Sequence, residues 1–258
     1  MNITFLGNGD SMGTPRVYCD CDVCGEARTT GDNVRFRSAV WLECEGESPL
    51  LLDCGPDFRA QMERLGVRRV TQGLITHAHF DHIGGLVDWS DMCRWREETA
   101  KLFAPAEVLD EIVRRFPWLG ERLDMIANDG GMTYGSWRIT PWKVNHGKNG
   151  FAYAYRFDQR ETGYAWAYCS DSFDLSPAEK EPLRGLSLLV LGTSFYEEPF
   201  PAETRSLYDV KEGLDLVREV GAAQAIFTHL SHDIDVRRDY GLPANVRLAL
   251  AGLAVRVG

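Results

Sequence analysis

The sequence predicts an α/β fold within a single domain that spans residues 1–258. One observation is the composition: 44% of the residues are hydrophobic and 26% are charged, as in globular proteins large enough to bury a core of their own. Another is that short runs rich in β-branched and aromatic residues alternate with amphipathic helical patterns. Finally, no segment rich in Pro, Gly or Ser separates the two halves, so we expect one layered domain.

Strand patterns occur along the whole chain, with fewer helical patterns between them. Short apolar runs predict strands at residues 3–6, 38–43, 50–53, 73–76, 138–144, 151–157, 164–168, 188–191 and 225–228. Helices are predicted at residues 57–65, 106–116 and 207–220. In the last of these, Val210, Leu214 and Val217 recur at intervals that place them on one face of a helix.

The charge of the chain limits its partners. It has 38 Asp and Glu against 28 Lys and Arg, a formal net charge of −10. Phosphate backbones repel such a chain unless it has a local basic surface, and none stands out, so a nucleic acid partner is disfavoured and a small substrate is expected. The N-terminus lacks a basic start followed by a long apolar core, and no run of about 18 apolar residues occurs. We therefore expect a cytoplasmic protein without a membrane partner.

The histidines are few and clustered. Three of the six lie in the segment His77-Ala-His79-Phe-Asp81-His82, directly after an apolar run that predicts a strand. In an extended segment the side chains at i and i+2 point the same way, so His77 and His79 can hold one metal ion. The turn through Phe80 then directs Asp81 and His82 elsewhere, toward a second ion. This spacing at a strand end predicts a site for two metal ions.

This segment resembles the HxHxDH signature of the metallo-β-lactamase superfamily, and further segments follow in the order of that family along nearly the whole chain. The resemblance implies an αββα sandwich, in which two mixed β-sheets pack face to face with helices outside, and a dinuclear metal site at one edge of the sheets. It also implies that Leu51-Leu-Asp53-Cys-Gly55 forms the strand and turn beneath the site. Asp53 would there orient a ligand histidine, although an Asp at a strand end is also a common turn former.

The same resemblance implies three further ligands, each at the end of a later apolar run. His146 follows Val144-Asn, Asp171 follows Tyr168-Cys-Ser, and His229 follows Phe227-Thr. Asp171 resembles the bridging aspartate of the family, whose two carboxylate oxygens can contact both ions. The implied set for the first ion is His77, His79 and His146, and that for the second is Asp81, His82 and His229.

A second metal site is indicated by the cysteines. Three of the seven crowd into Cys19-Asp-Cys21-Asp-Val-Cys24, which favours metal binding over disulfides. Three thiolates need a fourth ligand to close a tetrahedral zinc site, and a closed site is structural. His232 is the histidine that the dinuclear set leaves over, and the combination resembles the PhnP-like phosphodiesterases, in which CxCxxC and the second histidine of an HxxH motif hold such a zinc. We assign no function to the remaining cysteines, Cys44, Cys54, Cys93 and Cys169.

This narrower resemblance implies the hydrolysis of a small cyclic phosphodiester, such as a ribose 1,2-cyclic phosphate. The implied cofactors are two catalytic divalent ions, manganese or zinc, and one structural zinc. A hydroxide held between the two catalytic ions would attack the phosphorus, with Asp81 among the catalytic residues that hold them.

The sequence departs from this family at the position of the general acid. An alkoxide is a poor leaving group, and a general acid would speed its departure by about 10²–10⁴-fold. The close family uses an additional histidine from the loop before the late helix, but all six histidines here are assigned to metals. Tyr208 and Asp209 are the candidate donors in the matching segment, although Ser206 and Asp209 also suit helix capping, and a good leaving group would need no acid. The aromatic loop at residues 193–202 is suited to covering a substrate.

Other functions remain open. Another phosphodiesterase of the same superfamily is one, either a nucleotide cyclic phosphodiesterase or a tRNA 3′-processing nuclease. A lactamase or thioester hydrolase is disfavoured, because Asp81 together with a bridging Asp171 suits the harder dinuclear sites used on phosphates. A non-enzymatic module stabilised by metals is the alternative from a different class. A homodimer also stays open, since the segments 89–95 and 106–116 suit an interface or a pocket wall, although core packing is the commoner fate of such residues.

Overall fold

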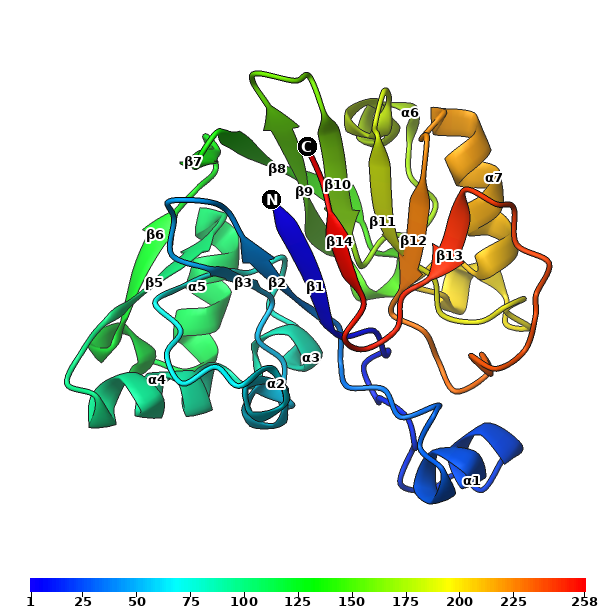
Figure 1. Ribbon diagram of the computed structural model, residues 1–258, viewed down its shortest axis with the longest axis horizontal. Helices are drawn as coiled ribbons and strands as arrows, with labels where there is room; N and C mark the ends of the chain where they lie inside the picture. The colour runs from blue at the N-terminus through cyan, green and yellow to red at the C-terminus, as the bar shows by residue number, and fades with distance from the viewer.

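Two seven-stranded β-sheets pack face to face between layers of helices in the computed structural model, which describes all 258 residues (Figure 1). The order in the first sheet is β14 (Ala254–Arg256), β1 (Asn2–Gly7), β2 (Ala39–Glu43), β3 (Leu50–Leu52), β4 (Gln72–Leu74), β5 (Ala100–Ala104) and β6 (Leu123–Ala127). The order in the second is β13 (Val246–Leu248), β12 (Ala225–Thr228), β11 (Leu188–Gly192), β10 (Ala165–Cys169), β9 (Phe151–Gln159), β8 (Trp137–Asn145) and β7 (Met132–Tyr134). This arrangement confirms the predicted αββα sandwich of two mixed sheets.

The central strands are buried on both faces. In β10, Trp166 and Tyr168 belong to the core between the sheets, whereas Ala167 and Cys169 face the helices that cover the second sheet. Successive side chains of a strand point to opposite faces, so a strand with a core on either side reads as a continuous apolar run. The inter-sheet core includes the stacked rings of Phe157 and Trp166, whose centroids lie 3.9 Å apart. Double burial thus explains why these strands were recognisable in the sequence.

Helices cover the outer face of each sheet (Figure 1). The first sheet is covered by α2 (Phe58–Leu65), α4 (Leu86–Trp95) and α5 (Ala106–Arg115), and the second by α6 (Pro177–Lys180) and α7 (Val210–Val220). The remaining helical segments are α1 (Asp22–Thr29), which projects from the sandwich, α3 (Phe80–Ile83), and the 3-10 turns η1 (Leu119–Glu121), η2 (Gly147–Asn149), η3 (Glu181–Leu183) and η4 (Ala202–Thr204). No helix is both long and apolar enough to cross a membrane.

All nine predicted strands and all three predicted helices are present, with one helix shorter than expected. Helix α7 begins at Val210, three residues after the predicted start at residue 207. The cause is a capping box: the Asp209 carboxylate accepts from the Glu212 amide at 2.8 Å, and the Glu212 carboxylate accepts from the Asp209 amide at 3.0 Å. The capping role expected for Asp209 is therefore confirmed. Ser206 is not the cap.

The topology brings the ends of several strands to one edge of the sandwich. Strands β3 to β6 run parallel in the first sheet, and β10 to β13 run parallel in the second. Strand β8 is separated from β10 by two antiparallel pairings, so it runs in the same direction as β10. The segments that leave the carboxyl ends of β3, β4, β8, β10 and β12 can therefore meet.

One buried hydrogen bond joins the two sheets directly beneath that edge. The hydroxyl of Tyr155, in β9, donates to the carbonyl of Ile75, just beyond β4, at 2.8 Å. Tyr155 is fully buried. The bond therefore links the second sheet to the segment that leads into His77.

We expect Tyr155→Phe to lower the free energy of unfolding by about 1–3 kcal/mol, because the buried Ile75 carbonyl loses its hydroxyl donor. Chemical denaturation of the metal-loaded protein measures the change. Tyr164→Phe is the control, since Tyr164 is only half-buried and packs edge-on against Trp137. Equal stability of the two variants would contradict a role for this bond.

Candidate metal centre

The six residues from His77 to His82 form a strand end followed by one helical turn. His79 precedes α3 with an extended backbone, and Asp81 and His82 lie within α3. The extended segment keeps His77 and His79 on one side, with His77 Nε2 and His79 Nδ1 2.8 Å apart. The helical turn carries Asp81 and His82 to another side. Local backbone geometry thus separates His79 from Asp81, as the sequence predicts, but the rings of His77 and His82 stay 4.3 Å apart, and both belong to a further group with Asp171.

The first pair is joined by His146, which follows β8. The ring centroid of His146 lies 5.3 Å from that of His77 and 5.2 Å from that of His79. Each of the three histidines offers one ring nitrogen, and these three nitrogens all lie within 4.8 Å of one another. His77 and His146 are buried, whereas His79 is half-buried at the mouth of a cavity.

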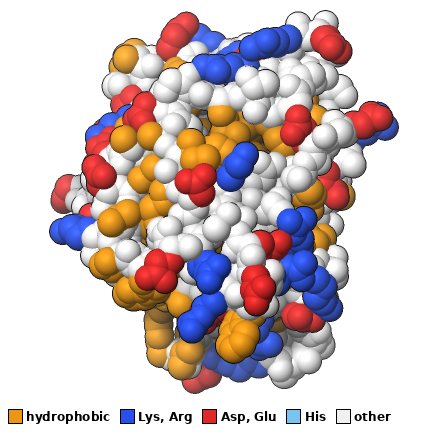
Figure 2. All heavy atoms as spheres, turned by 90° about the vertical axis from the view of Figure 1, so that its left-hand side faces the viewer, with side chains coloured by type: hydrophobic (Ala, Val, Ile, Leu, Met, Phe, Trp, Pro, Cys, Tyr) orange, Lys and Arg blue, Asp and Glu red, His pale blue; other side chains and the backbone are white.

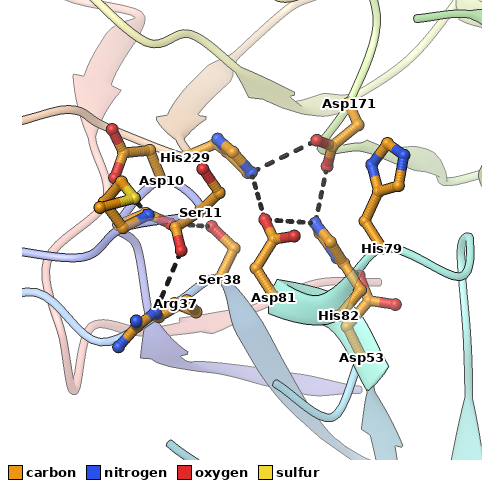
Figure 3. A network of polar contacts seen from close by, with 12 residues as sticks. Asp10, Ser11, Arg37, Ser38, Asp53, His79, Asp81, His82, Asp171 and His229 are labelled. Atoms are coloured by element: carbon orange, nitrogen blue, oxygen red, sulfur yellow. Dashed lines mark hydrogen bonds and ion pairs between the residues drawn. The ribbon is translucent and has the colours of Figure 1, made fainter. Parts of the chain in front are cut away.

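The second pair is joined by His229, which follows β12 (Figure 3). Asp81 Oδ2 lies 3.3 Å from His82 Nε2 and 3.3 Å from His229 Nε2. His229 has a φ of 60°, a left-handed conformation that is uncommon for a residue with a Cβ. Backbone outliers of this kind cluster at functional sites, where the surroundings hold them in place.

Asp171, which follows β10, lies between the two groups (Figure 3). Its Oδ2 is 3.1 Å from His82 Nε2, and its Oδ1 is 3.3 Å from His229 Nε2 and 3.6 Å from His146 Nε2. One carboxylate therefore faces ligands of both groups. The structure thus brings together all seven side chains named from the sequence, which are His77, His79, Asp81, His82, His146, Asp171 and His229.

The chemistry of these donors fits two divalent cations. Nε2 of His82, Nε2 of His229 and Oδ2 of Asp171 are buried and make no hydrogen bond. Ligands about 2.1 Å from one ion and about 90–109° apart would be about 3.0–3.4 Å from each other. The distances from His82 and His229 to the carboxylates of Asp81 and Asp171, between 3.1 and 3.3 Å, fall in this range.

Neighbouring groups fix the orientation of two ligand histidines. Asp53 accepts from Nδ1 of His82 at 2.8 Å and from the backbone amide of Thr76 at 2.9 Å. The carbonyl of Ser206 accepts from Nδ1 of His146 at 2.7 Å. A proton held on Nδ1 leaves Nε2 with its lone pair toward the centre. The structure therefore places Asp53 where the sequence analysis expects it, beneath the site and against a ligand.

Burial and the two carboxylates set the charge of the centre. Burial lowers the pKa values of His77 and His146, which keeps these imidazoles neutral. Burial also opposes protonation of His82. The nearby carboxylates outweigh this effect and raise the pKa of His82, with Asp171 making the largest contribution. The negative field that attracts a proton to His82 attracts a divalent cation for the same reason.

The four predicted zinc ligands also meet. Cys19, Cys21, Cys24 and His232 form one group with donor atoms within 4.8 Å of one another. Nδ1 of His232 lies 3.5 Å from Sγ of Cys21 and 3.4 Å from Sγ of Cys24. Tetrahedral zinc with bonds of about 2.3 Å to sulfur and about 2.05 Å to nitrogen requires an S···N distance of about 3.6 Å. This group therefore fits a closed zinc site.

A cavity of about 190 Å³ opens onto the dinuclear cluster. Its wall includes five of the seven ligands, and its other polar residues come from the N-terminal loop, from η2 and from the loop after β11. Neither Tyr208 nor Asp209 lines it. The hydroxyl of Tyr208 accepts from the amide of Leu175 at 2.8 Å, and Asp209 caps α7. The expectation that one of them donates a proton is corrected: both side chains are engaged away from the cavity.

Three charged residues and one amide of the wall are not singled out by the sequence: Asp10, Arg16, Glu198 and Asn149. Glu198 lies in the aromatic loop expected to cover a substrate, but nothing in the sequence distinguishes it from Glu197. The structure does, because Glu197 is exposed and pairs with Lys211, whereas Glu198 faces the cavity. Of the fourteen wall residues, Arg16 alone is a lysine or arginine, and it is paired with Asp10.

Residues 49–230 match the profile of the beta-lactamase superfamily domain. This span begins just before β3 and ends just after His229, so it contains all seven ligands of the dinuclear cluster. The three clustered cysteines and His232 lie outside it.

Curated relatives match the chain over part of their own length. An octanoyltransferase of Porphyromonas gingivalis is 28% identical over 266 residues, which cover 98% of this chain and 51% of that protein. A ribonuclease Z of Natronomonas pharaonis is 33% identical over 113 residues, which cover 41% of this chain and 29% of the relative. The chain thus spans about half, or less, of the length of these relatives.

Solved structures match the chain over nearly its whole length. A diphosphatase of the PhnP family is 28% identical, with a TM-score of 0.85 and coverage of 99% of this chain and 97% of that one. Zn²⁺-bound PqqB from Methylobacterium extorquens is 17% identical, with a TM-score of 0.79 and coverage of 99% and 100%. The second likeness concerns the fold alone.

We expect Asp53→Asn to weaken metal binding at the dinuclear cluster by about 10–100-fold. An amide that donates to Nδ1 of His82 would force the proton of that ring onto Nε2, where it blocks the metal. Asn also tolerates the φ of 62° at this position, so the backbone is preserved. Competition with a chromophoric chelator measures the affinity, and exposed Asp88→Asn is the control. Unchanged affinity in Asp53→Asn would exclude the orienting role.

We expect close to three metal ions per chain in the wild type and about two in Cys24→Ser, because a closed zinc site that loses one thiolate binds much more weakly. Elemental analysis after gel filtration gives the count. Cys44→Ser, outside the cluster, should keep all three. A wild-type content of one ion per chain would contradict this arrangement of a dinuclear cluster and a separate zinc site.

Proposed function

This chain belongs to the beta-lactamase superfamily, a family of metal-dependent hydrolases, and we propose that it hydrolyses a phosphodiester bond in a small molecule such as a ribose 1,2-cyclic phosphate. The observation that supports this most is the seven-ligand cluster, in which Asp81 belongs to one group and Asp171 faces both. Carboxylate oxygens suit the harder dinuclear centres that act on phosphates. The likeness to a diphosphatase of the PhnP family, at 28% identity along nearly the whole chain, points the same way.

The cofactors that we propose are two divalent ions in the dinuclear cluster, manganese or zinc, and one structural zinc among the cysteines. Bound divalent ions supply an activated water and neutralise charge on the phosphoryl oxygens. The side chains of the protein hold the geometry: Asp53 orients His82, and the Ser206 carbonyl orients His146. Phe195 and Leu207, the hydrophobic residues of the cavity wall, restrict the access of bulk water.

The charge of the cavity wall favours a small substrate over a nucleic acid. Beyond the metal ligands, the wall carries the carboxylates of Asp10 and Glu198, and its one cation, Arg16, is already paired. A site that follows a phosphate backbone needs unpaired lysines and arginines. On the face of the molecule shown in Figure 2, basic side chains are interspersed with acidic and hydrophobic ones. A tRNA-processing nuclease is therefore disfavoured.

There is room beyond the phosphate for the rest of a small molecule. A second cavity of about 260 Å³ shares His79 and Asn149 with the first. Its wall includes Arg115 and Phe151, together with the acidic side chains of α5. A phosphate placed at the dinuclear cluster would thus have a neighbouring space for a sugar ring.

A diphosphate ester is the second candidate substrate. The PhnP-family neighbour is a diphosphatase, and the cavity wall contains no histidine other than metal ligands. A phosphate leaving group is weakly basic and departs without a general acid. This candidate and the cyclic phosphodiester differ in the leaving group, so a substrate screen separates them.

We expect the metal-loaded protein to hydrolyse bis(4-nitrophenyl) phosphate with added Mn²⁺ or Zn²⁺, and to lose this activity after removal of metal by a chelator. Asp171→Asn should lower kcat by at least about 10²-fold, because it removes the carboxylate that faces both groups of ligands. Asp174→Asn is the matched control, three residues away and exposed.

The same assay extended to ribose cyclic phosphates, nucleoside cyclic phosphates, linear diesters and diphosphate esters ranks the substrate classes by kcat/KM. The proposal predicts the highest value for a small cyclic phosphodiester. Absence of turnover with every metal and every substrate would favour a metal-stabilised binding module instead.

A further inference from the structure

The cavity holds few groups that could give a proton to a leaving oxygen. Apart from metal ligands, its titratable side chains are Asp10, Arg16 and Glu198. Arg16 does not release its proton at physiological pH. The choice of proton donor is therefore between two carboxyl groups.

The carboxylate of Asp10 is occupied by hydrogen-bond donors. Its carboxylate pairs with the guanidinium of Arg16 and accepts from the amides of Met12 at 3.0 Å and Gly13 at 3.1 Å. Figure 3 shows Asp10 beside His229 in this constrained loop. The carboxylate of Asp10 thus holds the N-terminal loop together and is not directed at the cavity to present a proton.

Glu198 is placed firmly in the wall, yet its carboxyl group has no hydrogen-bond partner. The amide of Glu198 donates to Oδ2 of Asp209 at 3.0 Å, which anchors the backbone. Its side chain is 11% exposed, toward the cavity. The nearest cation is Nε of Arg205, at 3.5 Å, and that nitrogen makes no hydrogen bond. The Glu198 carboxyl therefore has one long ionic contact, to an arginine that it shares with other acids, and no short hydrogen bond that turns it away from the cavity.

The surroundings of Glu198 contain more acids than bases. Arg205 also faces Glu212, which accepts from its Nη1 at 2.9 Å, and Asp209, at 3.8 Å. The single guanidinium of Arg205 thus faces three carboxyl groups. Across the cavity, the negative charge of Asp10 is balanced by the positive charge of Arg16. Burial, with repulsion from Asp209 and Glu212, raises the pKa of Glu198. A proton on Glu198 relieves the excess of negative charge.

We propose that the carboxyl group of Glu198 donates the proton that the leaving oxygen takes up when the phosphodiester bond breaks, an assignment that rests on the proposed function. The oxygen of the attacking water bonds to phosphorus and its proton passes to solvent. The bond from phosphorus to the leaving oxygen breaks with its electron pair on that oxygen, which the proton from Glu198 neutralises. The Glu198 carboxylate recovers a proton from solvent before the next turnover.

The test uses a series of methyl aryl phosphates whose phenols range from 4-nitrophenol to the more basic 4-methoxyphenol, with the metal-loaded enzyme. For Glu198→Gln we expect the loss of kcat/KM to grow from about threefold with 4-nitrophenol to about 10²-fold with 4-methoxyphenol, because a basic leaving oxygen depends on the acid. Glu197→Gln, on the neighbouring exposed carboxylate, should match the wild type for every phenol. Any loss of kcat/KM in Tyr208→Phe should be the same for every phenol, because the Tyr208 hydroxyl binds the Leu175 amide away from the cavity.

The pH profile is the second measurement. A general acid acts only when protonated, so the wild-type kcat/KM for the 4-methoxyphenyl ester should fall as the pH rises through the pKa of Glu198. This alkaline fall should be absent in Glu198→Gln. Metal content and the melting temperature should equal those of the wild type, because Glu198 contacts no ligand of either metal group.

The outcomes separate the two proposals. Turnover by the wild type with an equal loss in Glu198→Gln for every phenol, or with no loss, would overturn the assignment of Glu198 while leaving the hydrolase proposal intact. No turnover of any aryl diester by the wild type would overturn both. A loss that rises with the basicity of the phenol, together with the changed pH profile, would support the assignment.

Discussion

Buried donor atoms without hydrogen bonds are the constraint on which the rest of the structure depends. Nε2 of His82, Nε2 of His229 and Oδ2 of Asp171 are all removed from water at one edge of the sandwich, and such burial is costly unless something replaces the lost hydration. A pair of divalent cations would satisfy these atoms together. The donors come from both sheets, since β4 leads to His82 while β10 and β12 lead to Asp171 and His229. The centre therefore exists only when the two sheets are packed, and the inter-sheet core determines its geometry.

The cysteine cluster extends this dependence to the N-terminal loop. His232 lies three residues beyond His229, so one short segment contributes to both metal groups. On the other side, the amide of Arg16 donates to Sγ of Cys24 at 3.4 Å, and the side chain of Arg16 lines the catalytic cavity against Asp10. A zinc ion at the cysteines would thus hold one wall of the cavity in place without touching the reaction. This gives a physical reason for a structural metal beside a catalytic one.

The opposite wall is organised by a single buried arginine. Arg205 lies over the ring of Phe173, with its guanidinium 4.8 Å from the ring centroid, and it faces the carboxyl groups of Glu198, Asp209 and Glu212. Two of these acids complete the capping box of α7, so the start of the helix and the cavity wall share one network. All six histidines lie in groups that could hold a metal ion, and the proposed proton donor, Glu198, belongs to the surplus of carboxyl groups around Arg205.

The sequence by itself determined the doubly buried strands, the two-metal motif and the order of the ligands, because these follow from local periodicity and from the spacing of residues such as His77 and His79. It missed β5 and β6 of the first sheet, and it missed the edge strands β7, β13 and β14, whose three residues each carry little pattern. It also could not choose among Glu197, Glu198, Tyr208 and Asp209. The direction of a loop side chain depends on contacts with distant segments, such as the Leu175 amide that binds Tyr208. Only the packed tertiary structure decides which of these groups reaches the cavity.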